Sequence, residues 1–285
     1  MRILEDKIIQ GALSCPLCHN NMTVQGASLV CCGERKHCFD FASGGYVNLC
    51  SPRQSGGGDS KQAVRARTEF LNKQYYRPIA DALAELVCKF APVGLPVLDA
   101  GCGEGYYTCA IANEGYSVIG VDLSKFATDA AAKRAARDGF DNAFFATGSV
   151  FELPVKYGSI GAITSIFAPC AADHFAAKLA RGGCLIVAAA GEDHLLGLKK
   201  VIYDDVHTNT ERADMPSDMI KIAEKRVRYS IDVIGNADVK SLFAMTPYYW
   251  RTSPQDAQKL ESVDALTTEV DVVLSVYTHN SKTEI

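Results

Sequence analysis

The stretch VLDAGCGEGYYT, residues 97–108, decides the fold expected for this chain. An apolar run that ends in Asp99 leads directly into a glycine-rich turn. This pattern is typical of a strand–turn–helix unit that binds a nucleotide-like ligand. The glycines alternate along the turn: Gly101, Gly103 and Gly105. Tyr106 therefore stands in the place of the third glycine of a dinucleotide fingerprint, and no G-K-[ST] follows. The turn thus disfavours both a pyrophosphate and a nucleoside triphosphate.

Two predicted strands end in an acid, Asp99 in the first and Asp122, within GVDLS, in the second. An acid before the turn suits a ligand with a positive charge and an amine. S-adenosylmethionine is such a ligand, because it joins a sulfonium and an α-ammonium group to adenosine. We expect Asp99 to orient the ammonium region, directly or through water, and Asp122 to accept hydrogen bonds from both ribose hydroxyls. Since NAD-binding proteins also carry the second acid, a nicotinamide oxidoreductase is the alternative to a methyltransferase.

From residue 95 onward, apolar runs alternate with helical patterns. This order predicts an α/β fold, a Rossmann-like S-adenosylmethionine-dependent methyltransferase domain with a mainly parallel sheet and helices on both faces. Residues 63–90 have helical spacing that Pro78 should break into two helices. The charged residues 203–240 are expected to form a helical insertion on the substrate side. FAMTPYYWR, 243–251, is expected either to close over the cofactor or RNA or to pack in the core.

Five of the eleven cysteines lie in the first forty residues, a clustering that favours a bound metal over disulfides. Cys15-Pro-Leu-Cys18 is a knuckle, and the run after it predicts a hairpin with Gly26 at its turn. Zinc takes four tetrahedral nitrogen or sulfur ligands, and it would stabilise a module too small for a core of its own. We expect the zinc ligands to be Cys15, Cys18, Cys31 and His37. Two further residues compete with the last two ligands: Cys32 and Cys38.

The net charge of −4 is unevenly distributed along the chain. Residues 1–80 carry ten Lys/Arg against six Asp/Glu, which points to a polyanionic partner, with a solvated face as the alternative. No apolar run is long enough to span a bilayer and the start does not resemble a signal peptide, so we expect a cytoplasmic protein that binds no membrane. A Gly/Ser-rich break suggests three parts: a zinc-binding RNA-recognition module (1–50), linker and helices (51–93) and the methyltransferase domain (94–285).

The motifs together resemble the RlmA family, the 23S ribosomal RNA guanine-N1 methyltransferases. The resemblance covers nearly the whole chain and rests on CPLC, HCFDFASGGYVNL, GDS, YYRPIADAL, VLDAGCGEGYYT, GVDLSK, IFAPC, HLLGLKKVIYDDVH and MTPYYWR. The glycine motif is common among methyltransferases, whereas the fused zinc module, FAPC and MTPYYWR are specific. The resemblance implies S-adenosyl-L-methionine and a structural Zn²⁺ as cofactors, and methylation of a guanine N1 in a hairpin loop of 23S rRNA. It also implies a homodimer whose two zinc modules frame one RNA cleft.

The resemblance adds site residues to those argued above. It implies a zinc bound by three cysteines and one histidine, although CCGERKH places extra residues between the third and fourth ligands here. It also places an aromatic residue and a histidine at the cofactor. For the histidine, the alternative is a simple position on the protein surface. The cofactor-binding candidates are then Tyr76, Asp99, Gly101, Gly103, Glu104, Gly105, Asp122, Leu123 and His194.

FAPC ends the fourth predicted strand, the usual place for the target-base pocket in this fold. The pocket candidates are Phe167, Ala168, Pro169 and Cys170. We expect Phe167 to lie against the face of the base and Cys170 to line the pocket, because N1 methylation needs no covalent adduct. No residue can be identified from the sequence as the catalytic base. A small-molecule methyltransferase would leave the metal module without a role, and the intact acids and glycines argue against a non-enzymatic zinc-dependent RNA-binding protein.

Overall fold

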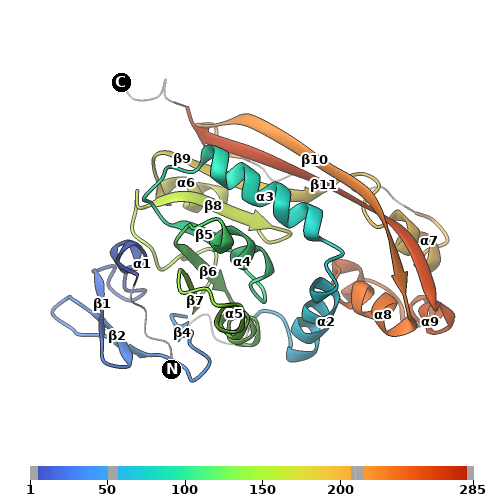
Figure 1. Cartoon of the computed structure of the whole chain (residues 1–285), viewed down its shortest axis with the longest axis horizontal. Helices are drawn as coiled ribbons and strands as arrows, with labels where there is room; N and C mark the ends of the chain where they lie inside the picture. The colour runs from blue at the N-terminus through green and yellow to red at the C-terminus, as the bar shows by residue number, and fades with distance from the viewer. Residues whose placement is uncertain (1–5, 51–56, 207–208, 210–214, 281–285) are drawn as a thin grey trace.

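The computed structural model describes residues 6–50, 57–206, 209 and 215–280 (Figure 1). Its centre is an eight-stranded sheet with the strand order β10-β11-β9-β8-β5-β6-β7-β4. Five neighbouring pairs, from β9 to β4, are parallel, and β11 and β10 add two antiparallel pairings at one edge. The predicted mainly parallel α/β fold is therefore confirmed.

The strands that lead to the site are mostly buried. They are β5 (Val97–Ala100), β6 (Val118–Asp122), β7 (Ala143–Thr147), β8 (Ile160–Ile166) and β9 (Leu179–Ala190). The helices between and around them are α3 (Arg77–Phe90), α4 (Tyr106–Asn113), α5 (Lys125–Asp138), α6 (Ala172–Lys178) and α7 (Leu196–Ile202). In the part of the chain that is described, no helix is long and apolar enough to cross a membrane.

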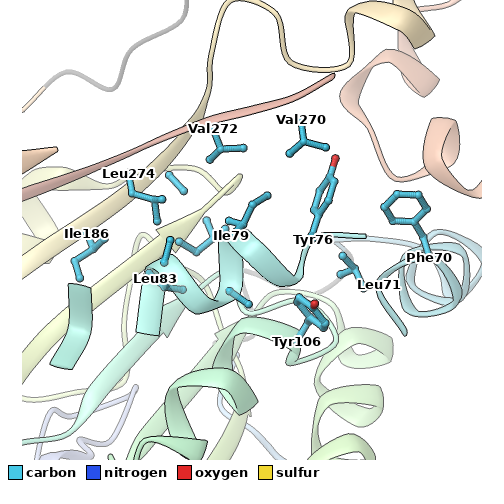
Figure 2. Close-up of a cluster of buried hydrophobic side chains, with 14 of the residues drawn as sticks. Phe70, Leu71, Tyr76, Ile79, Leu83, Tyr106, Ile186, Val270, Val272 and Leu274 are labelled. Carbon is cyan, nitrogen blue, oxygen red and sulfur yellow. The ribbon is translucent and has the colours of Figure 1, made fainter. Parts of the chain in front are cut away.

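Side chains of the central strands alternate between two buried clusters on opposite faces of the sheet. Val97 of β5 joins a cluster with α3, and its neighbour Leu98 joins the cluster on the other face. Figure 2 shows Ile79 and Leu83 of α3 lying against β11. Apolar strands buried on both faces are what a parallel sheet requires, since helices or other elements must cover each face.

The N-terminal module covers part of the second face. It consists of α1 (Lys7–Ala12) and a three-stranded antiparallel sheet of β1 (Met22–Gln25), β2 (Ser28–Cys31) and β3 (Cys38–Asp40). Gly26 lies in the β1–β2 turn with φ +58°, as the hairpin prediction requires. Ile9, Leu13 and Cys15 belong to the same buried cluster as Leu98, and β4 (Val47–Asn48) pairs with β7. The module thus shares its core with the main sheet.

The predicted helical insertion at 203–240 is wrong over most of the described part of that range. Residues 219–234 form the long strand β10 (Met219–Ile234), which pairs antiparallel with β11 (Ala265–His279). Only its last part is helical, in α8 (Asn236–Ala244), and 207–208 and 210–214 lie outside the described residues. The reason is a period of two: exposed and half-buried residues alternate along β10, and β-branched residues favour such a half-covered strand.

Two other expectations concern the segments around α3 and α8. The helix break at Pro78 is confirmed, because α2 (Lys61–Asn72) ends before it and Pro78 stands in the first turn of α3. FAMTPYYWR runs from α8 into a short 3₁₀ helix, η2 (Pro247–Trp250), followed by α9 (Pro254–Gln258) and η3 (Lys259–Ser262). Trp250 is 71% exposed, so its side chain does not pack in the core.

Candidate functional site

Four side chains of the N-terminal module converge on one point. The ligand atoms of Cys15, Cys18, Cys31 and His37 all lie within 4.8 Å of one another. The Cys18 and Cys31 Sγ atoms are 3.2 Å apart, and His37 Nδ1 is 3.4 Å from Cys15 Sγ. Three sulfurs and one imidazole nitrogen at this spacing fit the tetrahedral shell of zinc. By contrast, Cys32 and Cys38 are exposed and stand outside this group.

The module's backbone arranges this cluster. Cys15 and Cys18 flank a turn after α1, and Cys31 ends β2. The Cys31 backbone N–H donates to the carbonyl of His37 at 2.8 Å, which draws the loop between them back to the strand. The Gly33 N–H donates to Cys31 Sγ at 3.3 Å, which helps to orient this sulfur. The extra residues of CCGERKH are thus accommodated in a loop that closes on itself.

The glycine turn between β5 and α4 uses left-handed backbone at all three glycines. Their φ values are +80° at Gly101, +54° at Gly103 and +80° at Gly105. A Cβ on Gly101 would lie 2.5 Å from the Cβ of Ala168, and one on Gly105 would lie 2.9 Å from that of Ala131. Bare glycines therefore let the turn contact the loop after β8 on one side and α5 on the other.

The two strand-ending acids differ in their surroundings. Asp99 is 1% exposed, and its two oxygens accept hydrogen bonds from the hydroxyls of Thr108 (2.6 Å) and Thr164 (2.9 Å). Burial raises the pKa of Asp99 to about 6 although both hydroxyls oppose the shift. Asp99 thus ties β5 to α4 and β8 beneath the turn. Asp122 is half-buried and accepts from the Gly103 N–H (3.0 Å) and the Ser124 N–H (2.8 Å), so it fixes the turn's conformation.

A third acid, Glu104, is buried inside the turn. Its Oε1 has no hydrogen-bond partner among the described residues, and the Arg134 guanidinium lies 3.8 Å away. Burial raises the pKa of Glu104, against the attraction of Arg67 and Arg134. An orphaned buried carboxylate oxygen beside a glycine turn is a group that a cationic ligand would satisfy. The acidic side chains around the turn therefore fit S-adenosylmethionine, which carries two positive groups.

Three rings meet above the turn. The Tyr76 hydroxyl is 3.5 Å from His194 Nε2, and the Phe167 ring stacks on the His194 ring with 5.5 Å between centroids. Tyr76 precedes α3, Phe167 follows β8 and His194 precedes α7, so three separate segments supply the cluster. Tyr76 and His194 are buried, whereas Phe167 is 44% exposed. The alternative that His194 is a surface histidine is wrong.

The protonation state of His194 follows from its surroundings. Burial lowers its pKa to about 4, against the attraction of Asp271, and Nδ1 accepts a hydrogen bond from the Asp271 N–H at 3.3 Å. The Asp271 carboxylate in turn accepts two bonds from the Arg226 guanidinium, at 2.6 and 2.7 Å. A neutral imidazole that accepts at Nδ1 carries its proton on Nε2, the nitrogen that faces Tyr76.

We predict that His194 makes stability pH-dependent. Because its folded-state pKa is below the ordinary 6.5, its contribution is complete above pH 6.5 and is lost as the pH falls through about 4. The shift corresponds to about 3 kcal/mol of unfolding free energy. Urea unfolding of H194Q between pH 4 and 7 should show a shallower pH dependence than the parent. The exposed His174 provides the control, H174Q, and equal slopes for H194Q and the parent would contradict the prediction.

The loop after β8 is held in a strained conformation. Phe167 has φ +53°, which a bulky side chain rarely adopts. The Ser165 hydroxyl donates to the Ala168 carbonyl at 3.3 Å. The Cβ of Ala168 occupies the space that a side chain on Gly101 would need. Pro169 is exposed, and burial raises the pKa of the half-buried Cys170 to about 11, so its thiol is not activated as a nucleophile. These positions form one wall beside the glycine turn.

Sequence reasoning missed part of this site. Arg67 is not among the predicted site residues, yet its Nη1 lies 3.3 Å from the position of a Cβ on Gly103. Asp59 pairs with it at 2.5 Å. A Cβ on Gly57 would meet Leu123 at 2.6 Å, so the end of the supposed linker packs on the turn after β6. The helical spacing of α2 showed which residues face the core but gave no sign of this neighbour.

Two family models match the chain. The first, described as "RlmA, N-terminal", a zinc ribbon, covers residues 13–54, and the second, "Methyltransferase domain", covers 97–182. The chain combines an RlmA N-terminal zinc ribbon with a methyltransferase domain. The resemblance that the sequence motifs indicated is therefore confirmed, and with it S-adenosylmethionine and structural zinc as the cofactors.

Curated relatives extend the likeness along the chain. One, from Bacillus subtilis (strain 168), is named "Putative 23S rRNA (guanine-N(1)-)-methyltransferase YxjB"; it is 28% identical over 92% of this chain and 96% of its own. Another, from Streptomyces fradiae, is named "23S rRNA (guanine(748)-N(1))-methyltransferase"; it is 29% identical over 86% of this chain and 88% of its own. Both matches extend well beyond the two family models, since they cover most of each chain.

Proposed function

We propose that this chain transfers a methyl group from S-adenosylmethionine to N1 of a guanine in a hairpin loop of 23S rRNA. The observation that carries the proposal is the contact between the glycine turn and the loop after β8, where Gly101 meets Ala168. Phe167, which precedes Ala168, is 44% exposed and stacks on His194, and this exposure supports a role in stacking on a base. The names of the curated relatives support the same reaction.

The chain's own residues would position the two reactants. When bound, S-adenosylmethionine supplies an electrophilic methyl group to an in-line displacement, so much of the rate comes from orientation. Asp122 holds the Gly103 N–H and has further lone pairs for the ribose hydroxyls, and Leu123 offers an apolar surface beside them. Tyr76 and His194 back the Phe167 ring from behind. No described side chain takes the role of a general base, and the guanine N1 proton leaves to water.

RNA loops are read by splaying bases onto aromatic side chains, which suits Phe167. We therefore predict that F167A lowers kcat/KM for RNA by about 5- to 150-fold, the loss of one base-stacking contact of ~1–3 kcal/mol. The affinity for S-adenosylmethionine should not change. Phe151, also exposed, gives the control F151A. Steady-state kinetics with RNA as the varied substrate measure the effect, and a loss confined to cofactor affinity would contradict it.

The remaining parts of the chain complete this proposal. Residues 1–50 would recognise the RNA, and residues 51–93 would connect this module to the main domain. Residues 94–285 would form the methyltransferase domain. A cytoplasmic location follows from an rRNA substrate. We also propose the homodimer implied by the family resemblance, which analytical ultracentrifugation with and without RNA tests directly.

The experiment that tests the function is transfer of labelled methyl from S-adenosylmethionine to 23S rRNA that lacks the modification. Digestion to nucleosides should yield labelled 1-methylguanosine, and a zinc chelator should abolish it. Labelled RNA that is insensitive to chelation would keep the enzyme and remove the role of zinc. Cofactor binding without any labelled RNA would instead favour a small-molecule methyltransferase, the alternative that the domain composition alone allows.

A further inference from the structure

Arg67 is a cation that lies over the middle of the glycine turn. It projects from α2, and its Nη1 lies 3.3 Å from the position that a Cβ on Gly103 would take. Its side chain is 25% exposed, so it is not fully sealed from solvent. A guanidinium has five N–H donors, and Asp59 accepts from one of its nitrogens, Nη2. Donors thus remain for a ligand that enters beside Gly103.

The charges around Arg67 are otherwise negative. Burial acts to lower its pKa, but the carboxylates of Asp59, Glu104 and Asp122 outweigh burial and raise it. The second nearby cation, Arg134, is buried behind the turn, where Nε donates to the Glu104 carbonyl at 3.1 Å and the guanidinium lies over the Tyr106 ring. Of these two arginines, Arg67 is therefore the one that a ligand in the turn would meet.

S-adenosylmethionine presents three charges: a sulfonium, an α-ammonium and an α-carboxylate. The acids of the turn suit the two positive groups but would repel the carboxylate, which needs a cation to offset its desolvation. A guanidinium matches a carboxylate with two parallel N–H groups. Resting on the proposed function, we propose that Arg67 binds the α-carboxylate of the methionine part of S-adenosylmethionine.

Asp59 positions Arg67 for this role. Its carboxylate pairs with the guanidinium at 2.5 Å, while its backbone carbonyl accepts from the Ser124 hydroxyl at 2.7 Å. Ser124 directly follows the Asp122-Leu123 pair, and a Cβ on Gly58 would lie 2.7 Å from the Ser124 nitrogen. The segment before α2 is thereby fixed to the turn after β6. This link places the carboxylate-binding arginine and the proposed ribose-binding acid in one rigid arrangement.

The test compares two ligands that differ only in the carboxylate: S-adenosylmethionine and its decarboxylated form, which keeps the sulfonium, the amine and the adenosine. Their dissociation constants are measured by calorimetry, without RNA, for the parent and R67Q. R67Q should weaken S-adenosylmethionine by about 10- to 100-fold, the range for a lost charge-assisted hydrogen bond, and leave the decarboxylated form unchanged. R67K should recover part of the loss.

Arg65 provides the matched control, because it lies on the same helix, is 80% exposed and pairs only locally with Glu69. R65Q should bind both ligands like the parent. D59N should weaken S-adenosylmethionine selectively, by less than R67Q. Equal weakening of both ligands in R67Q, or no weakening, would overturn the assignment. Failure of the parent chain to bind S-adenosylmethionine at all would instead overturn the proposed function.

Discussion

G101A is expected to lower kcat/KM for methyl transfer by about 10²–10³-fold, because a displaced reactant and an overpacked contact both act at the site. Gly101 has φ +80°, and the new Cβ would lie 2.5 Å from the Cβ of Ala168. Either the glycine turn or the loop that carries Phe167 must move. Calorimetric titration with S-adenosylmethionine and single-turnover methyl transfer to RNA would separate the loss of cofactor affinity from misplacement of the base.

G115A separates this contact from backbone strain. Gly115 has nearly the same conformation, φ +87°, but a Cβ there meets nothing within 4 Å. Both variants take on a left-handed alanine, which costs about 1–2 kcal/mol of stability. Only G101A also disturbs the two loops of the site. If G115A lost as much activity as G101A, the contact between Gly101 and Ala168 would have no part in catalysis.

C31A is expected to lose zinc and unfold the N-terminal module. Structural zinc sites contribute an apparent ~10–16 kcal/mol at neutral pH in zinc-finger peptides, so the loss of one ligand removes most of the energy that holds such a module together. Cys31 also belongs to the buried cluster shared with the main sheet, and unfolding should expose this face. Metal content by mass spectrometry and the unfolding temperature by calorimetry give the two readouts.

C32A is the matched control, because Cys32 is the next residue and is exposed. It should keep one zinc per chain and the parent's unfolding temperature. The same comparison applies to H37A and C38A, since His37 lies in the cluster and Cys38 outside it. Loss of zinc in C32A with retention in C31A would reverse the assignment of the third ligand.

Much of this site could be predicted because its signals are local. Asp99, the alternating glycines and Asp122 sit at strand ends that apolar runs mark out, and the cysteine spacing identifies a metal cluster. The strand β8 ends at Ile166, one residue before the FAPC segment that the sequence pattern put at the end of the strand. Local patterns succeed here because strand ends of a parallel sheet share one edge, which brings these segments together without further information.

The missed features depend on contacts between distant segments. The stretch around Arg226 is rich in charged residues, which is typical of a solvated helix until its pairing with β11 is known. Arg67 lies on a helix whose sequence has no mark of the turn it covers, and its partner Asp59 stands in a stretch typical of linkers. The shared core of Cys15 and Leu98 likewise joins two parts that composition separates.

Methylation of 23S rRNA by this chain is tested by reverse transcription of the rRNA from cells with and without the chain, together with mass spectrometry of the nucleosides. A methyl group on guanine N1 blocks the base-pairing edge and stops the polymerase. One stop and one 1-methylguanosine should vanish when the gene is deleted and return with the parent gene but not with G101A. An unchanged pattern of stops and nucleosides after deletion would contradict this expectation.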